Sequence, residues 1–508
     1  MRVAVAAVGA LWWASGSARV RAAGVEDTVT GAVALGRSAN YVRVNDFMAV
    51  WQNPANLALL PGKDLGLELR LPIFNGCFDR EPDPKIQALG PAGYLATESF
   101  EESCNSAGIM PAGSLGFALP LPRHFGFGVG LFTPGGVPKL KFGHSEVNAI
   151  GLDPATETLP ISTGKTESPG RYLLVDKNVT AAWLMVGAGW APLKQLRFGL
   201  SVGSGVVSVD YRNVTSLLAG TFTDPEFASH VQVADWFVPR ATLSAAATPL
   251  DSLDLMASFT WTDDVSAKGD LDVVANGFDN APRGDCGSPT PGPHCRVKDT
   301  TLDIPYQRYE VVLGARFAKR NKPREQVLDP MKDEVFDVEL NGLWSQTSHV
   351  DNFTLKINEG RTVTQRVALS TDPSVNPSPL PQNATLFHGW RNTYGLRLGG
   401  DYNVLPSRLA VRAGVAYESS GVPAKNMNID YWPVQKFTLS LGATVAVQRW
   451  KFSLAYAHVF FESVTTPVGT GNVREITAVG DPKTAQPVNE GKYTASLNVI
   501  SLQANYTF

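Results

Sequence analysis

Apolar and polar residues alternate through five short segments in the last third of the chain, from Trp390 to Phe508. In the segment 435–447, phenylalanine, leucine, alanine and valine occupy the odd positions from Phe437 onward, and threonine, serine and glycine occupy most of the even ones. Because successive side chains of a β-strand point to opposite faces, each segment has one apolar and one polar face. A water-soluble sandwich shows the same alternation, so the charges and the connections must decide between the two kinds of sheet.

Fourteen segments of the chain are predicted to be strands, and most are long enough for a tilted strand to cross the hydrocarbon layer. They span residues 65–73, 113–121, 125–132, 179–190, 195–210, 236–248, 253–266, 306–318, 335–348, 390–404, 408–417, 435–447, 450–461 and 493–508. Connections after even-numbered strands are short, with 319–334 the longest, and connections after odd-numbered strands are all long. This arrangement is typical of an outer-membrane barrel, and an even strand count places both termini on the short-turn, periplasmic side.

Charged residues of both signs lie opposite the apolar face of several predicted strands. In 65–73, four leucines share one face and Glu68 and Arg70 lie on the other. The polar faces of three later segments carry Arg308, Glu310, Arg316, Asp337, Glu339, Arg397 and Asp401. In lipid, apolar faces turn outward, charges pair in the lumen, and the sheet must close so that every backbone group is paired. We therefore predict an all-β fold, a transmembrane antiparallel β-barrel of 14 strands.

Aromatic residues near the ends of these segments predict girdles at the two membrane interfaces. They are Phe132, Trp190, Trp236, Trp261, Trp390, Trp450, Phe460 and Phe461.

Composition excludes several classes of protein. Charged residues make up 18% of the chain and the net charge is −3, which gives no indication of nucleic-acid binding. Beyond the N-terminus no apolar run is long enough for a membrane-spanning helix. Residues 1–23 are predicted to be a secretory signal peptide, with Arg2 before an apolar stretch and small residues near Ala23. Export implies an oxidising compartment, in which cysteines pair.

The four cysteines fall in two of the predicted long loops. Cys77 and Cys104 share the loop after the first strand, and Cys286 and Cys295 share the loop after the seventh. Four cysteines allow three pairings. The shared loops favour the local one, with disulfides Cys77–Cys104 and Cys286–Cys295. A metal site is disfavoured because there is no CxxC motif and no histidine at ligand spacing.

Catalytic motifs are lacking in the sequence, so we expect no enzyme, no cofactor and no metal. Gly126, Gly128 and Gly130 form a GxGxG pattern, but apolar residues alternate with them, which indicates a strand with a glycine face. Such a smooth face suits a crowded lumen or close contact with a plug. The aspartates of the loop 269–280 allow calcium binding, although their spacing is not that of an EF-hand and a solvated loop is the favoured alternative.

Segment 24–61 is too polar and irregular to be a strand, and it carries a Gly-Arg-Ser, an aspartate and an Asn-Pro-Ala in that order. This order resembles the N-terminal plug motif of the FadL-like long-chain fatty acid and hydrocarbon transporters, with Ser38 in place of the usual alanine. The matching residues are Gly36, Arg37, Asp46, Asn53, Pro54 and Ala55. Segment 128–136 is similar to the third strand of that family, which ends in a Pro-x-Gly loop, and 389–417 is similar to its late strand pair.

The resemblance implies a domain organisation of signal peptide 1–23, N-terminal lumenal plug 24–61 and barrel 62–508 with long extracellular loops. It implies a monomer in the outer membrane of a Gram-negative bacterium, multi-pass, with both termini periplasmic. In the family, an apolar solute is caught among the extracellular loops, passes beside the plug and leaves sideways at the third strand. Here Pro134, Gly135 and Gly136 are the candidates for that lateral gate. The alternation up to Phe508 resembles the signature that barrel-assembly machinery reads.

The expected function is passive uptake of hydrophobic small molecules, with long-chain fatty acids and aromatic hydrocarbons both compatible. The expected partners are the hydrophobic solute, outer-membrane lipid and the assembly machinery, with no nucleic acid. Lumenal arginines that are candidates for holding a carboxylate are Arg308, Arg316, Arg397 and Arg412. The alternative, favoured for most of them, is pairing with Glu310, Asp337, Glu339 and Asp401. Two other classes stay open: a barrel enzyme acting on lipids, and a structural or adhesive barrel without transport.

Overall fold

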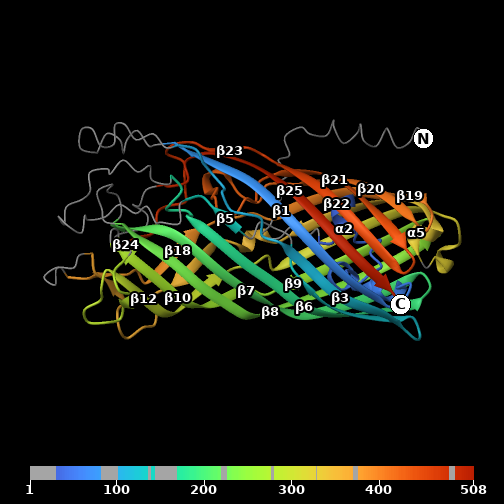
Figure 1. Ribbon diagram of the computed structural model, residues 1–508, viewed down its shortest axis with the longest axis horizontal. Coiled ribbons are helices and arrows are strands. Elements are labelled where there is room, and N and C mark those ends of the chain that lie inside the picture. Colours follow the sequence, from blue (N-terminus) through green and yellow to red (C-terminus); the bar gives the residue numbers. More distant parts are fainter. Residues whose placement is uncertain are drawn as a thin grey trace.

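Fourteen strands close into one antiparallel barrel in the computed structural model of the protein, within the part of the chain that the structure describes (Figure 1). The described residues are 30–81, 101–134, 139–143, 169–218, 226–275, 278, 280–327, 329–369, 376–479 and 487–508. The barrel strands are β1 (Asp64–Arg80), β3 (Ala112–Leu121), β4 (Phe125–Phe132), β6 (Asp176–Leu193), β7 (Leu196–Leu218), β8 (Glu226–Leu250), β9 (Leu253–Thr262), β13 (Tyr309–Arg320), β14 (Glu334–Ser345), β19 (Thr393–Leu405), β20 (Leu409–Glu418), β21 (Lys436–Val447), β22 (Trp450–Phe461) and β25 (Gly491–Thr507). Each pairs with its neighbours in this order, and β25 closes the ring against β1.

The predicted fold class is confirmed, and each predicted segment coincides with one barrel strand. The segments 125–132 and 450–461 match β4 and β22 to the residue. The short turns gather at the end of the barrel where the C-terminus and the small helix α5 (Pro330–Asp333) lie (Figure 1). Several boundaries were wrong: β1, β7 and β8 extend further toward the long-loop end than predicted, with β8 beginning at Glu226 and not at residue 236, and the segment predicted as 253–266 ends at Thr262. There the Asp264 carboxylate accepts a hydrogen bond from the Tyr306 backbone, and a new strand begins at Val265.

Apolar side chains face outward and charged side chains face inward in the lower part of the wall. Leu67 is 56% exposed and Leu441 is 63% exposed, whereas Glu68 and Arg316 are almost completely buried. These exposures exclude a sandwich, in which the leucines would meet in a core. Among the described residues, no helix is long and apolar enough to cross a bilayer.

The aromatic residues predicted to form girdles divide into two groups. Trp190, Trp236, Trp450, Phe460 and the half-buried Trp261 face outward. Phe132 and Trp390 are buried and Phe461 packs against the core, and for these three the interpretation was wrong. Phe132 follows the outward-facing Leu131, so the alternation turns it inward whatever its distance from the strand end.

Above the apolar band the wall continues as a second structure, which we call the extension. It comprises the upper parts of β7 and β8 together with β10 (Val265–Ala275), β12 (His294–Ile304), β15 (Asn352–Lys356) and β18 (Asn383–Phe387). These strands lie at the long-loop end of the barrel (Figure 1). Smaller elements complete that end: β2 (Ser103–Cys104), β5 (Lys139–Lys141), β11 (Gly284–Asp285), β16 (Arg366–Val367), β17 (Ser378–Pro379), β23 (Val464–Thr466), β24 (Thr477–Val479), η3 (Thr347–His349) and η4 (Ala424–Asn426). Helix η2 (Arg324–Gln326) lies near α5 in the chain.

Both predicted disulfides are present. Cys77–Cys104 joins β1 to β2, and Cys286–Cys295 lies in the extension. Asp270 and Asp272 of the calcium-binding alternative form ion pairs with Arg296, and Asp279 lies outside the described residues.

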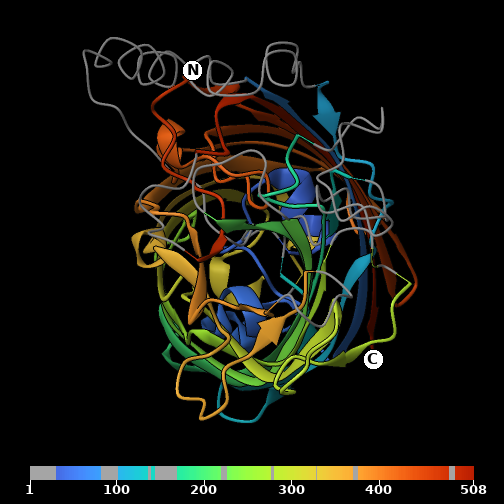
Figure 2. The same ribbon diagram turned by 90° about the vertical axis from the view of Figure 1, so that its left-hand side faces the viewer.

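The N-terminal segment, residues 30–61, lies inside the ring of strands (Figure 2, blue). It contains α2 (Ala32–Arg37), α3 (Ala49–Gln52) and η1 (Pro54–Leu59). Helix α2 contacts β20, β21 and β22 on one side of the lumen, and η1 contacts β4, β6 and β7 on the other. The predicted signal peptide 1–23 lies outside the described residues.

Candidate functional site

A buried network of charges ties the N-terminal segment to strands β14 and β19 of the wall. The Arg37 guanidinium lies 2.6 Å from the Asp337 carboxylate on β14 and 3.3 Å from the Asp401 carboxylate on β19. Arg43 contacts the same two carboxylates, each at 3.1 Å. Because removing one partner of such a network leaves a buried charge uncompensated, the pairs fix where the segment sits.

Glycines of the wall make room for the backbone of this segment. A Cβ on Gly199 would lie 2.0 Å from the Ala55 nitrogen, and a Cβ on Gly399 would lie 1.7 Å from the Arg37 carbonyl oxygen. On the predicted glycine face of β4, a Cβ on Gly126 would meet the Leu57 carbonyl oxygen at 1.7 Å. Only glycine permits such an approach.

The remaining motif residues shape the segment itself. The Asp46 carboxylate accepts hydrogen bonds from the Met48 backbone at 3.0 Å and from Gln503 on β25 at 2.8 Å. The Asn53 amide donates to the Tyr41 carbonyl oxygen at 2.8 Å. Pro54 begins η1, where its missing N–H costs nothing, and the Ala55 N–H donates to Ser244 on β8. Gly36 lies against the Arg412 side chain.

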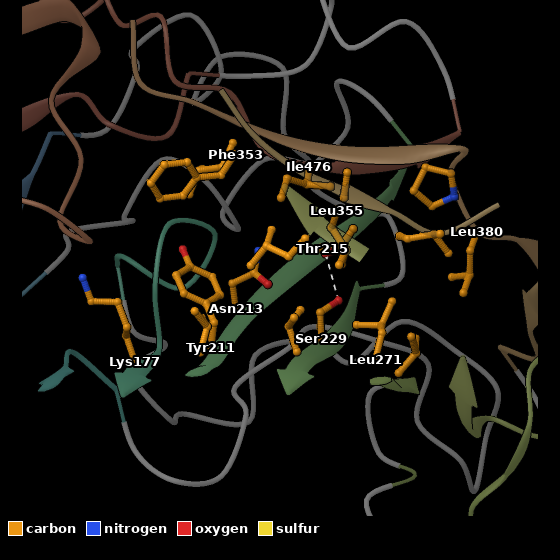
Figure 3. A pocket seen from close by; sticks show the side chains of 18 of the residues that line it. Lys177, Tyr211, Asn213, Thr215, Ser229, Leu271, Phe353, Leu355, Leu380 and Ile476 are labelled. Atoms are coloured by element: carbon orange, nitrogen blue, oxygen red, sulfur yellow. Dashed lines mark hydrogen bonds between the residues drawn. The ribbon is translucent and has the colours of Figure 1, made fainter. Parts of the chain in front are cut away.

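An apolar cavity lies in the extension, lined by inward-facing side chains of several strands (Figure 3). Its lining includes Val209, Phe227, Val231, Leu271, Val273, Leu302, Ile304, Phe353, Leu355, Leu380 and Leu386. Few polar groups reach it, and two of these, Thr215 and Ser229, share a hydrogen bond with each other at 3.2 Å. We call this the upper cavity.

Lys177 and Tyr431 line the upper cavity and also a second, larger one beneath it, which we call the lower cavity. The Lys177 ammonium donates to the Asp430 carbonyl oxygen and lies 3.5 Å from the centre of the Tyr431 ring. Burial lowers the pKa of Lys177 to about 8, against the opposing influence of the Asp430 carboxylate. That carboxylate is 2.9 Å from the His388 ring. Within the described residues, no carboxylate forms an ion pair with Lys177.

The lower cavity reaches the barrel wall at the ends of β3 and β4. Its lining there includes Ala112, Thr133 and Pro134, and across from them Thr180 and Ala181 of β6. Arg70 donates to the carbonyl oxygens of Thr133 and Pro134 at 2.9 and 3.0 Å, which holds the chain as it leaves β4. Of the proposed gate residues, Pro134 therefore borders the cavity, and Gly135 and Gly136 lie outside the described residues.

All four arginines singled out in the sequence are ion-paired. Arg308 pairs with Asp264 at 2.5 Å, Arg316 with Asp337 at 2.7 Å, Arg397 with Glu418 at 2.5 Å and Arg412 with Asp401 at 3.2 Å. None of them is among the residues that line the upper or lower cavity. The sequence reasoning missed Lys177, although extending the alternation of the fourth predicted strand back from Val179 by two residues places Lys177 on its inward face.

The closed ring, the outward apolar band and the filled lumen define the class of protein: a transmembrane β-barrel whose lumen holds its own N-terminal segment. Within that class, residues 348–508 match the model of the family described as "Outer membrane protein transport protein (OMPP1/FadL/TodX)". The resemblance expected from the sequence is confirmed by this match, which covers the last third of the chain. No curated protein is detectably similar in sequence.

Solved structures share the fold at low sequence identity. A FadL homologue from Pseudomonas aeruginosa has a TM-score of 0.67 and 16% identity, over 96% of this chain and 100% of that one. The toluene transporter TodX of P. putida has a TM-score of 0.58 and 14% identity, over 96% and 99%. The toluene transporter TbuX of Ralstonia pickettii has a TM-score of 0.54 and 14% identity, over 94% and 98%.

Proposed function

We propose that this protein takes up hydrophobic small molecules across the outer membrane without an energy source of its own. The observation that carries the proposal is an apolar cavity at the long-loop end that adjoins a second cavity reaching the wall. Each buried CH₂ group contributes about 0.8 kcal/mol, so a chain-like or aromatic solute partitions from water into such a lining. The names of the similar solved structures, a FadL homologue and two toluene transporters, support a cargo of this kind.

The N-terminal segment serves as the plug in this proposal. Its charge network and glycine contacts fill the lumen below the cavities, so water and ions have no straight path through the barrel. A solute in the lower cavity then leaves through the wall beside Pro134, where the described ladders of β3 and β4 end, and enters lipid. The short-turn end, where the C-terminus lies, is the periplasmic side.

Lys177 favours a carboxylic acid over a neutral hydrocarbon as the cargo. A cargo carboxylate at the junction of the two cavities would meet the ammonium while its apolar tail occupies the upper cavity. Arg308, Arg316, Arg397 and Arg412 are poorer candidates for this role, because each would first have to leave an acidic partner.

Binding of palmitate and of hexadecanol to the purified protein tests this assignment. Lys177→Met is expected to weaken palmitate binding by roughly tenfold or more, the loss of about 1.4 kcal/mol or more for a charge-assisted hydrogen bond, and to leave hexadecanol unchanged. Lys194→Met, in the short turn after β6, is the matched control. Equal loss for both ligands would assign Lys177 a structural role, and no uptake of either by cells making the wild-type protein would overturn the transport proposal.

A further inference from the structure

Among the described residues, which leave out 135–138 between β4 and β5, the ladder of the barrel wall is interrupted between β1 and β6. On one side the ladder of β1 with β3 ends at the pair Arg70 and Ala112, and on the other the ladder of β4 with β6 ends at Phe132 and Trp183. Just below, Leu131 and Leu184 belong to the outward apolar band, so the interruption opens at the upper margin of the lipid-facing surface. We call this interruption the window.

The wall closes again above the window through a short crossbar, residues 103–106. Its β2 part pairs with β1 at Cys77 and Phe78, and the Asn105 N–H donates to the Gly76 carbonyl oxygen at 2.7 Å. Its other side holds the β5 region, since the Ser106 N–H donates to the Lys141 carbonyl oxygen at 2.8 Å and the Lys141 N–H donates to the Asn105 side chain at 2.9 Å. Strand β5 in turn pairs with β6.

The chain from this crossbar down to β3, residues 108–111, crosses the height of the window. For these four residues no hydrogen bond is found within the described part of the chain, in contrast to the ladders on every side. A Cβ added to Gly108 would have no atom within 4 Å, and Ile109 is 53% exposed. Met110 and Pro111 line the lower cavity. We call residues 108–111 the strip, and it forms part of the wall here, with Ile109 exposed and Met110 and Pro111 on the cavity.

We propose that the strip is the moving part of the lateral exit and that the Cys77–Cys104 disulfide sets how wide the exit opens. The inference rests on the proposed function, because it supposes that cargo leaves through this wall. The disulfide ties the crossbar covalently to β1, whereas the rest of the crossbar is held by a few hydrogen bonds. With the Cys77–Cys104 disulfide intact, the strip is anchored at both ends, and its outward displacement opens a gap wide enough only for a slender chain. Without the disulfide the crossbar detaches from β1 and the opening widens.

The tie is accessible, since Cys104 is exposed and Cys77 is half-buried. The second disulfide, Cys286–Cys295, provides a matched control because both of its cysteines are fully buried in the extension, away from β1 and β6. The double variants are C77S/C104S and C286S/C295S.

The experiment compares uptake of palmitate with uptake of a pyrene-substituted fatty acid in cells making each variant. Loss of Cys77–Cys104 is expected to raise the ratio of bulky to slender uptake by roughly threefold to tenfold, which corresponds to a barrier lowered by about 0.7–1.4 kcal/mol. Equilibrium binding of both probes to the purified protein is expected to be unchanged. The C286S/C295S variant should keep the wild-type ratio, and heat-modifiable migration in gels verifies that each barrel has folded.

If C77S/C104S does not fold, brief treatment of wild-type cells with a membrane-impermeant thiol reductant gives the same comparison. An unchanged ratio with intact wild-type uptake, or the same change in both double variants, overturns the inference and leaves the proposed function standing. Absence of uptake by the wild-type protein overturns both.

Discussion

Strand β7 passes through two environments, and its two halves are built in opposite ways. In the lower half the outward residues are Phe198, Leu200 and Val202, and the inward ones are arginine, glycine and serine. In the upper half the outward residues are Ser208, Asp210 and Arg212, and the inward ones are valine, tyrosine, asparagine and threonine. The strand keeps its alternation while the chemistry of its faces exchanges, because lipid surrounds the lower half and water surrounds the upper half.

Strand β8 makes the same exchange with an extra residue. Its register with β7 shifts between Gly205 and Val207, where Trp236 and Phe237 stand opposite a single residue. Both aromatic side chains point outward, at 77% and 71% exposed. Below this bulge the even-numbered residues of β8 face inward, and above it the odd-numbered residues do.

The inward faces of the lower barrel and of the extension differ in composition and in what they enclose. The inward face of the lower barrel is polar or glycine and is filled by the N-terminal segment. The inward face of the extension is apolar and encloses a cavity. In the proposed function, solute binding therefore belongs to the extension and blocking belongs to the lower barrel, although the same strands build both.

Deletion of Phe237 is expected to have the largest effect, because it removes the bulge and reverses which β8 residues face inward above it. Phe227, Val231 and Val233 would then face water, at about 1.5–3 kcal/mol each, or roughly 5 kcal/mol or more in total. The variant is expected to lose the upper cavity or to fail assembly. Trp236→Ala/Phe237→Ala keeps the residue count and should assemble, as heat-modifiable migration will check. Normal folding and binding in the deletion variant would show that the bulge does not determine which residues of β8 face inward above it.

A charge on the outward face separates the two environments directly. Leu441→Arg places a cation in lipid and is expected to lower the free energy of unfolding by about 2–4 kcal/mol. Ser208→Arg, outward on β7 in the extension, is expected to change it by less than about 0.5 kcal/mol. Denaturant unfolding in lipid vesicles measures both, and similar losses would contradict the placement of the membrane boundary between them.

A side chain at a wall glycine tests the filled lumen. Gly199→Val would overlap the Ala55 backbone and is expected to cost about 1–3 kcal/mol of stability and to raise ion conductance in planar bilayers as the N-terminal segment is displaced. The control is Gly342→Val, since a Cβ at Gly342 meets nothing within 4 Å. Conductance that stays at the wild-type level would argue against a blocking role for the segment.

The pH dependence of palmitate binding tests whether Lys177 of the extension holds the carboxylate. It is the smallest of the expected effects. The lowered pKa of Lys177, about 8, means that its ammonium is charged below that pH and neutral above it. A bound carboxylate favours the charged form, so palmitate affinity is expected to fall by roughly tenfold between about pH 7 and about pH 9. Hexadecanol affinity should stay constant over this range. A parallel fall for both ligands would point to a change in the cavity and not in Lys177.

Much of the lower barrel was predictable from sequence because lipid imposes a rule on every second residue. The exposed Leu67 and the buried Glu68 follow from alternation alone. The order of the strands follows from the regular sorting of short and long connections. The disulfides followed from shared loops. The extension escaped prediction because its polar outward face and mixed inward face give weaker alternation, and because the β8 bulge breaks the period at Trp236.

The sequence therefore determined which segments form the barrel wall and which way most of their residues face, since the cost of a charge in lipid leaves one choice. The contacts between side chains inside the barrel became known only from the tertiary structure. The partners of Arg397 and Arg308 proved to be Glu418 and Asp264, and Lys177 came to lie between two cavities, because these contacts join residues far apart in the chain and depend on strand register and loop course.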